Sequence, residues 1–136
     1  MGLDMYLLKR KKFREGNNAY NELTKKLLSE EVMYWRKANQ IRSWIVNNTI
    51  YEEKWNDEEV ELTKETLEKL KADCETVMDD PSKAQKIFPT STGFFFGSTD
   101  YGEWYFNELE FTATVIGHIL EETDFENETI IYTESW

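Results

Sequence analysis

The spacing of apolar residues constrains the fold of this chain more than any other feature. Three segments carry apolar residues at three- and four-residue intervals, which is the spacing of one buried helix face. The first predicted helix follows Ser29, a good N-cap residue, and ends near Asn48. Its predicted buried stripe is Tyr34, Ala38, Ile41 and Ile45.

Two further helices are predicted in the second half of the chain. One begins after the N-cap residue Thr63 and ends before Pro81, which starts a short additional helix. Its predicted stripe is Leu67, Leu70, Cys74 and Val77. The other begins near Asp100 and Glu103, which have the spacing of a capping box, and ends after Glu122. Its predicted stripe is Phe106, Leu109, Ala113, Ile116 and Leu120.

Strand-like patterns occur at both ends of the chain. Residues 2–9 alternate imperfectly in polarity and residues 129–133 are β-branched or aromatic, whereas residues 49–60 are expected to form a loop. A short β-like run is also expected over residues 94–96. The predicted fold class is therefore α+β, with three main helices packed on a small antiparallel sheet that pairs the N- and C-terminal strands. The length of 136 residues is typical of one domain, so we expect residues 1–136 to form a single globular domain.

The scarcity of cysteine and histidine excludes several kinds of site. One cysteine, Cys74, cannot form an intramolecular disulfide or a multi-thiolate zinc site, and one histidine, His118, cannot form a paired-histidine metal site. Both side chains are expected to pack in the protein. The nucleotide-binding glycine motifs and the glycine of a calcium loop are also missing. We therefore expect no catalytic residues, no metal and no cofactor.

The charge of the chain is negative and uneven. The net charge is −11, and residues 100–136 hold ten acidic residues and no Lys or Arg. Direct nucleic-acid binding is disfavoured because phosphate contacts need a basic face. The candidate acidic surface is Glu121, Glu122, Asp124, Glu126 and Glu128. Ordinary solubility is the alternative role for these acids. No apolar run has transmembrane length and no signal peptide is recognisable, so a cytosolic protein without a membrane partner is expected.

Two segments combine residue types that suit binding. In the first, aromatic rings supply flat contact area, and cations and amides suit a ligand that carries a ring and an acid. Its candidate residues are Trp35, Arg36, Lys37, Asn39, Gln40 and Trp44. The alternative is a core helix whose cationic stems cover aromatic rings.

The second segment spans residues 93–106. Its candidate residues are Ser98, Thr99, Asp100, Tyr101, Glu103 and Trp104. The acids make a phosphate-binding loop improbable, but a cation of the first segment could pair with Asp100 or Glu103 and join the two segments. Alternatively, exposed aromatic residues here could form a hot spot for a protein partner.

Four segments together resemble one family. They are Met1-Gly2-Leu3-Asp4-Met5-Tyr6-Leu7, Tyr34-Trp35-Arg36-Lys37-Ala38-Asn39, residues 93–106, and the closing Tyr132-Thr133-Glu134-Ser135-Trp136. The chain resembles, over nearly its whole length, small uncharacterised proteins encoded by bacteriophages and prophages. The resemblance implies a phage-encoded origin and a location in the bacterial host cytoplasm. It implies no catalytic residues.

The leading functional hypothesis is a non-enzymatic protein that binds a host protein or assembly. If the acidic surface mimics DNA, the partner would be a nucleic-acid-binding protein. In one form of this hypothesis, the chain inhibits a bacterial defence system such as CRISPR. The alternative is a small-molecule or nucleotide-signal binding protein, a sponge that would use Trp35, Arg36, Asn39, Trp44 and Tyr101. An enzyme ranks third because no nucleophile–base pair is recognisable.

Overall fold

The computed structural model describes residues 3–12, 28–49, 59–90 and 101–135. Its elements are β1 (Asp4–Lys11), β2 (Glu30–Arg36), α2 (Asn39–Asn48), β3 (Glu59–Leu62), α3 (Lys64–Asp79), the 3₁₀ turn η1 (Pro81–Lys83), α4 (Ala84–Ile87), α5 (Glu103–Glu122) and β4 (Glu128–Ser135). The strands form an antiparallel sheet in the order β2-β1-β4-β3. The α+β fold class and the pairing of the N- and C-terminal strands are confirmed, because β1 pairs with β4 from Asp4↔Ser135 to Lys11↔Glu128.

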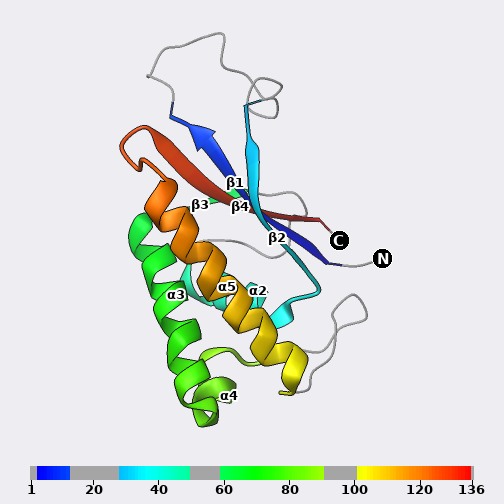
Figure 1. Cartoon of the computed structure of the whole chain (residues 1–136). Helices are drawn as coiled ribbons and strands as arrows, with labels where there is room; N and C mark the ends of the chain where they lie inside the picture. Colours follow the sequence, from blue (N-terminus) through cyan, green and yellow to red (C-terminus); the bar gives the residue numbers. More distant parts are fainter. Residues whose placement is uncertain (1–2, 13–27, 50–58, 91–100, 136) are drawn as a thin grey trace.

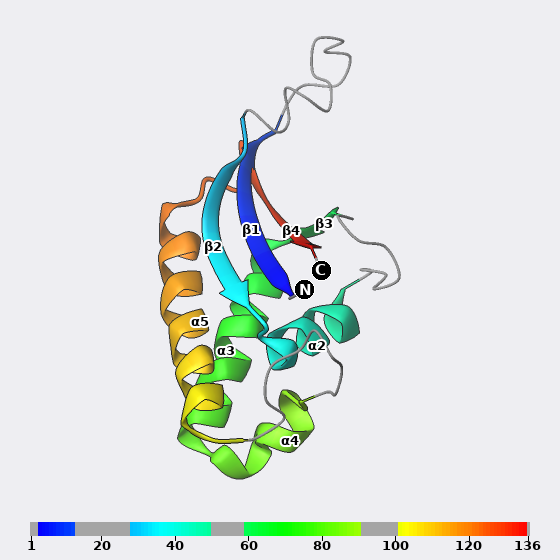
Figure 2. The ribbon, with the colours of Figure 1, turned by 90° about the vertical axis from the view of Figure 1, so that its right-hand side faces the viewer.

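The described helices lie on one side of this sheet. Helices α3 and α5 run side by side in opposite directions, and α2 packs near the end of the sheet where β2 finishes (Figures 1 and 2). The sheet and the helices therefore form two layers. The opposite face of the sheet points away from α3 and α5 (Figure 2).

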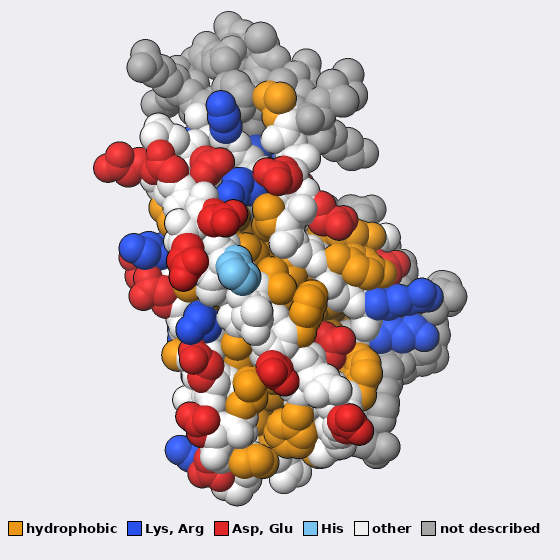
Figure 3. All heavy atoms as spheres, in the orientation of Figure 1, with side chains coloured by type: hydrophobic (Ala, Val, Ile, Leu, Met, Phe, Trp, Pro, Cys, Tyr) orange, Lys and Arg blue, Asp and Glu red, His pale blue; other side chains and the backbone are white. Residues whose placement is uncertain are grey.

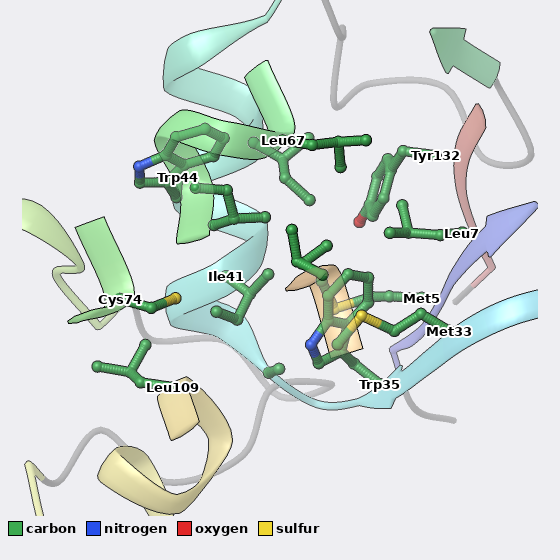
Figure 4. Close-up of a cluster of buried hydrophobic side chains, with 14 of the residues drawn as sticks. Met5, Leu7, Met33, Trp35, Ile41, Trp44, Leu67, Cys74, Leu109 and Tyr132 are labelled. Atoms are coloured by element: carbon green, nitrogen blue, oxygen red, sulfur yellow. The ribbon is translucent and has the colours of Figure 1, made fainter. Parts of the chain in front are cut away.

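The hydrophobic core lies between the two layers. Met5 and Leu7 of β1 and Tyr132 of β4 point from the sheet toward α2, α3 and α5 (Figure 4). All four residues of the predicted α3 stripe are fully buried: Leu67, Leu70, Cys74 and Val77. The predicted N-cap is also confirmed, since the Thr63 hydroxyl accepts the backbone N–H of Thr66.

The predicted start of the first helix is wrong. Residues 30–36 form strand β2 and pair with β1, with Trp35 opposite Met5. Trp35 is buried and Tyr34 is 40% exposed, so the chain alternates here as a strand does. Lys37 then takes a positive φ of 55° and donates its backbone N–H to the Leu3 carbonyl, which turns the chain into α2.

Helix α5 also differs from the prediction at its start. It begins at Glu103, so Gly102 occupies the N-cap position and no side chain caps the helix. The predicted capping box is therefore wrong, and Asp100 lies outside the described residues. In the predicted stripe, Phe106 and Leu120 are only half-buried. The other buried residues of α5 are Tyr105, Leu109, Thr112, Ala113, Ile116 and Ile119.

Two shorter predictions have different outcomes. Strand β3 begins at Glu59, so the end of the loop predicted over residues 49–60 is wrong, and Val60 and Leu62 alternate into the core. Residues 50–58 of that predicted loop lie outside the described residues. The β-like run predicted over residues 94–96 lies outside the described residues. Within the described ranges, no helix has both the length and the apolar character needed to cross a membrane.

Candidate functional site

The two tryptophans of the first candidate segment belong to the core. Trp35 is 1% exposed and its indole N–H donates to the Thr112 hydroxyl at 2.9 Å. Trp44 is 2% exposed and its indole N–H donates to Asp73 Oδ2 at 2.8 Å. Both indole groups therefore already have partners inside the protein. Neither ring offers an exposed face to a ligand.

The polar residues around the start of α2 divide between the core and the surface. Asn39 and Gln40 are fully buried, and neither polar atom of the Gln40 side-chain amide has a hydrogen-bond partner within the described ranges. Arg36 is exposed at the end of β2, and Lys37 is half-buried. Arg42 is buried and forms a 2.6 Å ion pair with Glu134 of β4. The first segment is therefore mostly structural.

The second candidate segment is only partly described. Ser98, Thr99 and Asp100 lie outside the described residues, so their predicted pairing with the first segment lies there too. Tyr101, Glu103 and Trp104 are exposed where α5 begins. The Tyr101 hydroxyl accepts the Thr90 backbone N–H at 3.3 Å. The exposed rings therefore lie at one end of α5.

The exposed rings at the start of α5 continue into a stripe along the helix. Trp104, Glu108, Phe111 and Val115 follow one another at intervals of four, three and four residues, so they share one helix face. Trp104 is 42% exposed and Phe111 is 46% exposed. We call these four residues the α5 stripe. Figure 3 shows hydrophobic side chains along this face of the molecule, with acidic side chains among them.

Glu108 is the unusual member of the α5 stripe. Its side chain is half-buried, and its Oε2 atom is buried without a hydrogen-bond partner in the described part of the chain. Burial raises the pKa of this carboxyl above its ordinary value because the charged form loses solvation. A partly desolvated carboxylate between two exposed rings is an acceptor that a cationic group of a partner could satisfy.

A cleft of about 250 Å³ extends this face toward the end of α5. Its lining residues come from β1, β2 and α5: Lys9, Glu30, Glu31, Val32, Val115, His118, Ile119 and Glu122. Val115 thus belongs to both the cleft and the α5 stripe. His118 is exposed, so the expectation that it packs in the protein is wrong.

The electrostatics of α5 are strongly negative. Its residues include five acids and no Lys or Arg, and the acids are Glu103, Glu108, Glu110, Glu121 and Glu122. Lys9 of β1 reaches the end of the helix, where its ammonium group donates to the Glu122 carbonyl at 3.4 Å. A basic partner would therefore be attracted to this face.

The predicted acidic surface after α5 is partly structural. Glu121, Glu122, Asp124 and Glu126 are exposed, and Glu128 is half-buried. Asp124 accepts hydrogen bonds from the Asn127 side chain and the Glu126 backbone, and these bonds lower the pKa of its carboxyl. Glu128 in turn accepts the Asp124 backbone N–H. Two of the five acids thus shape the turn that leads into β4.

The sequence prediction missed three members of the α5 stripe: Glu108, Phe111 and Val115. The interval from Trp104 to Phe111 is two helical turns, and this signal could have revealed the stripe once the helix was predicted. No group of three or more His, Cys, Asp or Glu residues suited to a metal ion occurs among the described residues. No family model, curated protein or solved structure matches the chain.

Proposed function

We propose that this chain is a non-enzymatic binding protein that uses the α5 stripe to engage a bacterial host protein. The observation that carries the proposal is the position of Glu108 between Trp104 and Phe111. Its Oε2 atom is buried without a partner in the described ranges, while both neighbouring rings remain more than two-fifths exposed. Aromatic residues are enriched at protein interfaces, and tryptophan is enriched among the residues that contribute most of the binding energy.

The charge of α5 indicates the kind of partner. The helix carries five acids without Lys or Arg, and its 20 residues span about 30 Å. A partner with an apolar surface and a Lys or Arg side chain would cover Trp104 and Phe111 and pair with Glu108. The host origin of this partner rests on the resemblance to phage-encoded proteins. Inhibition of a defence system such as CRISPR would be one consequence of such binding.

The proposal is tested by affinity capture from bacterial cells with the wild-type chain and matched variants. Trp104→Ala, Phe111→Ala and Glu108→Gln each change the α5 stripe, and Met78→Ala serves as the control because it removes a 37% exposed apolar side chain from α3. We expect a specific captured protein to be lost or strongly reduced with the three stripe variants and retained with Met78→Ala. Capture should also weaken as the salt concentration rises.

Two results would contradict the proposal. The first is a captured protein that binds equally to the wild type and to all three stripe variants. The second is a nucleotide that raises the melting temperature of the purified chain in a concentration-dependent way. That second result would favour a nucleotide-binding protein in place of a protein-binding one.

A further inference from the structure

The sheet face that points away from α3 and α5 carries a second cleft. Strand alternation places Tyr6 of β1 on this face, because its neighbours Met5 and Leu7 point into the core. Tyr34 of β2 is directly opposite Tyr6 in the register. The cleft has a volume of about 470 Å³ and is lined by Asp4, Tyr6, Glu31, Tyr34 and Arg36. The cleft is shallow and open to solvent, so it suits a small ligand held on one side only.

The two tyrosine rings form the centre of the cleft. Their centroids are 5.3 Å apart and their planes are inclined by 44°. The Tyr34 hydroxyl donates a 2.6 Å hydrogen bond to Asp4 Oδ1, which restricts the orientation of that ring. Tyr34 is 40% exposed, so part of its surface is accessible from solvent. Faces of aromatic rings attract cations through their quadrupole.

Carboxylates lie at both ends of this tyrosine pair. Asp4 is two residues before Tyr6 on β1, and Glu31 of β2 is opposite Leu8, two residues after Tyr6. Asp4 and Leu8 are therefore about 13 Å apart along the strand, with the rings between them. The pKa of Tyr6 is raised by burial and then by the charges of Asp4 and Glu31. Both acids thus make the potential at this ring negative.

Arg36 is the one cation among the lining residues. It is opposite Asp4 in the register, at the far end of the cleft from Glu31. Two carboxylates and one guanidinium leave the lining with a net negative charge. The part of the cleft between Tyr6 and Glu31 is therefore the most favourable position for a positive charge.

We propose that this cleft binds a small organic ammonium cation on the faces of Tyr6 and Tyr34, between the carboxylates of Asp4 and Glu31. Tyr6 and Tyr34 lie on the opposite side of the sheet from α5, and Glu31 of strand β2 lines both this cleft and the cleft beside α5. The proposal does not depend on the binding function proposed above, because Glu31 is not a member of the α5 stripe. The ammonium group would gain cation–π contacts from the rings and charge attraction from the two acids.

The test is a titration with tetramethylammonium chloride, followed by NMR of the labelled tyrosine rings of the full chain. A parallel titration with sodium chloride at the same ionic strength removes the general effect of salt. We expect saturable shifts of the Tyr6 and Tyr34 ring signals with tetramethylammonium, and no saturable shift of Tyr101. Tyr6→Phe and Tyr34→Phe assign the signals and keep the ring faces.

Three charge variants then decide the sign of the ligand. Glu31→Gln should weaken the affinity by about two- to fivefold, which is the range of a cation–π or exposed charge contact. Arg36→Gln should strengthen the affinity, because it removes a positive charge that repels the ammonium cation. The control is Glu61→Gln, an exposed acid of β3 that does not line the cleft, and it should leave the affinity unchanged.

Several outcomes would overturn the proposal. Equal shifts of the tyrosine ring signals in the tetramethylammonium chloride and sodium chloride titrations would show only a general effect of salt. Equal effects of Glu31→Gln and Glu61→Gln would show attraction to the general negative charge of the sheet face, not to the cleft. A loss of affinity with Arg36→Gln, or saturable binding of acetate in place of the cation, would identify an anion site. Melting temperatures confirm that each variant is folded.

Discussion

The indole N–H of Trp35 donates to the hydroxyl of Thr112 at 2.9 Å and joins strand β2 to helix α5 through the core. Both side chains are buried. The Thr112 hydroxyl donates in turn to the Glu108 carbonyl at 2.7 Å. The first bond joins α5 to the sheet, and the second lies within α5. Thr112 belongs to the buried face of α5, and Trp104 and Phe111 are exposed.

Thr112→Val should destabilise the protein. Valine keeps the volume of threonine but leaves the Trp35 indole N–H without its acceptor in the core, which costs about 1–3 kcal/mol. The control is Thr114→Val on the exposed side of the same helix, for which we expect a change within about 0.5 kcal/mol. Urea denaturation measures the free energy of unfolding of both variants. Equal stabilities of the two variants would show that the Trp35–Thr112 bond contributes nothing.

Glu134→Gln should destabilise the protein more than Thr112→Val does. Glu134 is fully buried and its Oε2 atom lies 2.6 Å from Arg42 Nε, so the substitution removes a negative charge that contacts the buried guanidinium. Loss of one charge of a buried pair costs up to about 5 kcal/mol. Lys71→Met breaks the exposed Lys71–Glu75 pair and should cost less than about 1 kcal/mol. Comparable losses in urea unfolding would contradict this difference.

Cys74 should be unreactive in the folded protein. Its side chain is fully buried in α3, and burial raises the pKa of its thiol, so the reactive thiolate is scarce at pH 8. The chain has one cysteine, so the reaction with a chromogenic disulfide reagent reports on this residue alone. We expect slow reaction in buffer and complete reaction in denaturant. Rapid reaction in buffer would mean that this region of α3 opens readily.

Glu108→Gln should make stability less dependent on pH. Burial raises the folded-state pKa of Glu108, so ionisation of this carboxyl destabilises the folded wild type. This penalty is absent below the unfolded pKa of about 4.3 and is complete above the raised folded pKa. The variant should therefore gain stability relative to the wild type as the pH rises from about 4 to 7. Thermal melts across this range measure the gain.

The same variant separates structural from functional roles of Glu108. A purely structural carboxylate would be expected to stabilise the fold, so its removal would lower the melting temperature at pH 7. We expect the melting temperature to rise while capture of the protein partner decreases. Such opposite changes are typical of residues retained for binding at the expense of stability.

Local patterns in the sequence were sufficient for much of the fold. Thr63 and the stripe from Leu67 to Val77 predicted α3 correctly, because capping and helical spacing act within a few residues. The same spacing over Tyr34 to Ile45 favoured a helix that began too early. Trp35 instead pairs across the sheet with Met5, and this distant partner outweighs the local helical spacing. Because acidic residues surround Val60 and Leu62, the sequence predicted a loop where the four-residue strand β3 begins.

The candidate site was predicted only in part. Trp104 and the acidic character of α5 were identified from the sequence, but Trp35 and Trp44 were assigned to a binding segment and lie in the core. Composition could not separate these cases, because an indole ring suits both a core and an interface. The burial of a tryptophan depends on which face of its strand or helix is covered. That face is set by elements from distant parts of the chain.

The amino-acid sequence by itself determined the net charge, the exclusion of an intramolecular disulfide by a single cysteine, and the helix α3, whose spacing and cap are local. Only the tertiary structure decided that residues 30–36 form a sheet edge, that Arg42 meets Glu134, and that Tyr6 lies against Tyr34. Each of these contacts joins residues more than about 20 positions apart. Such pairs form through the burial of a shared core and the register of strands, and neither is visible in a short window of sequence.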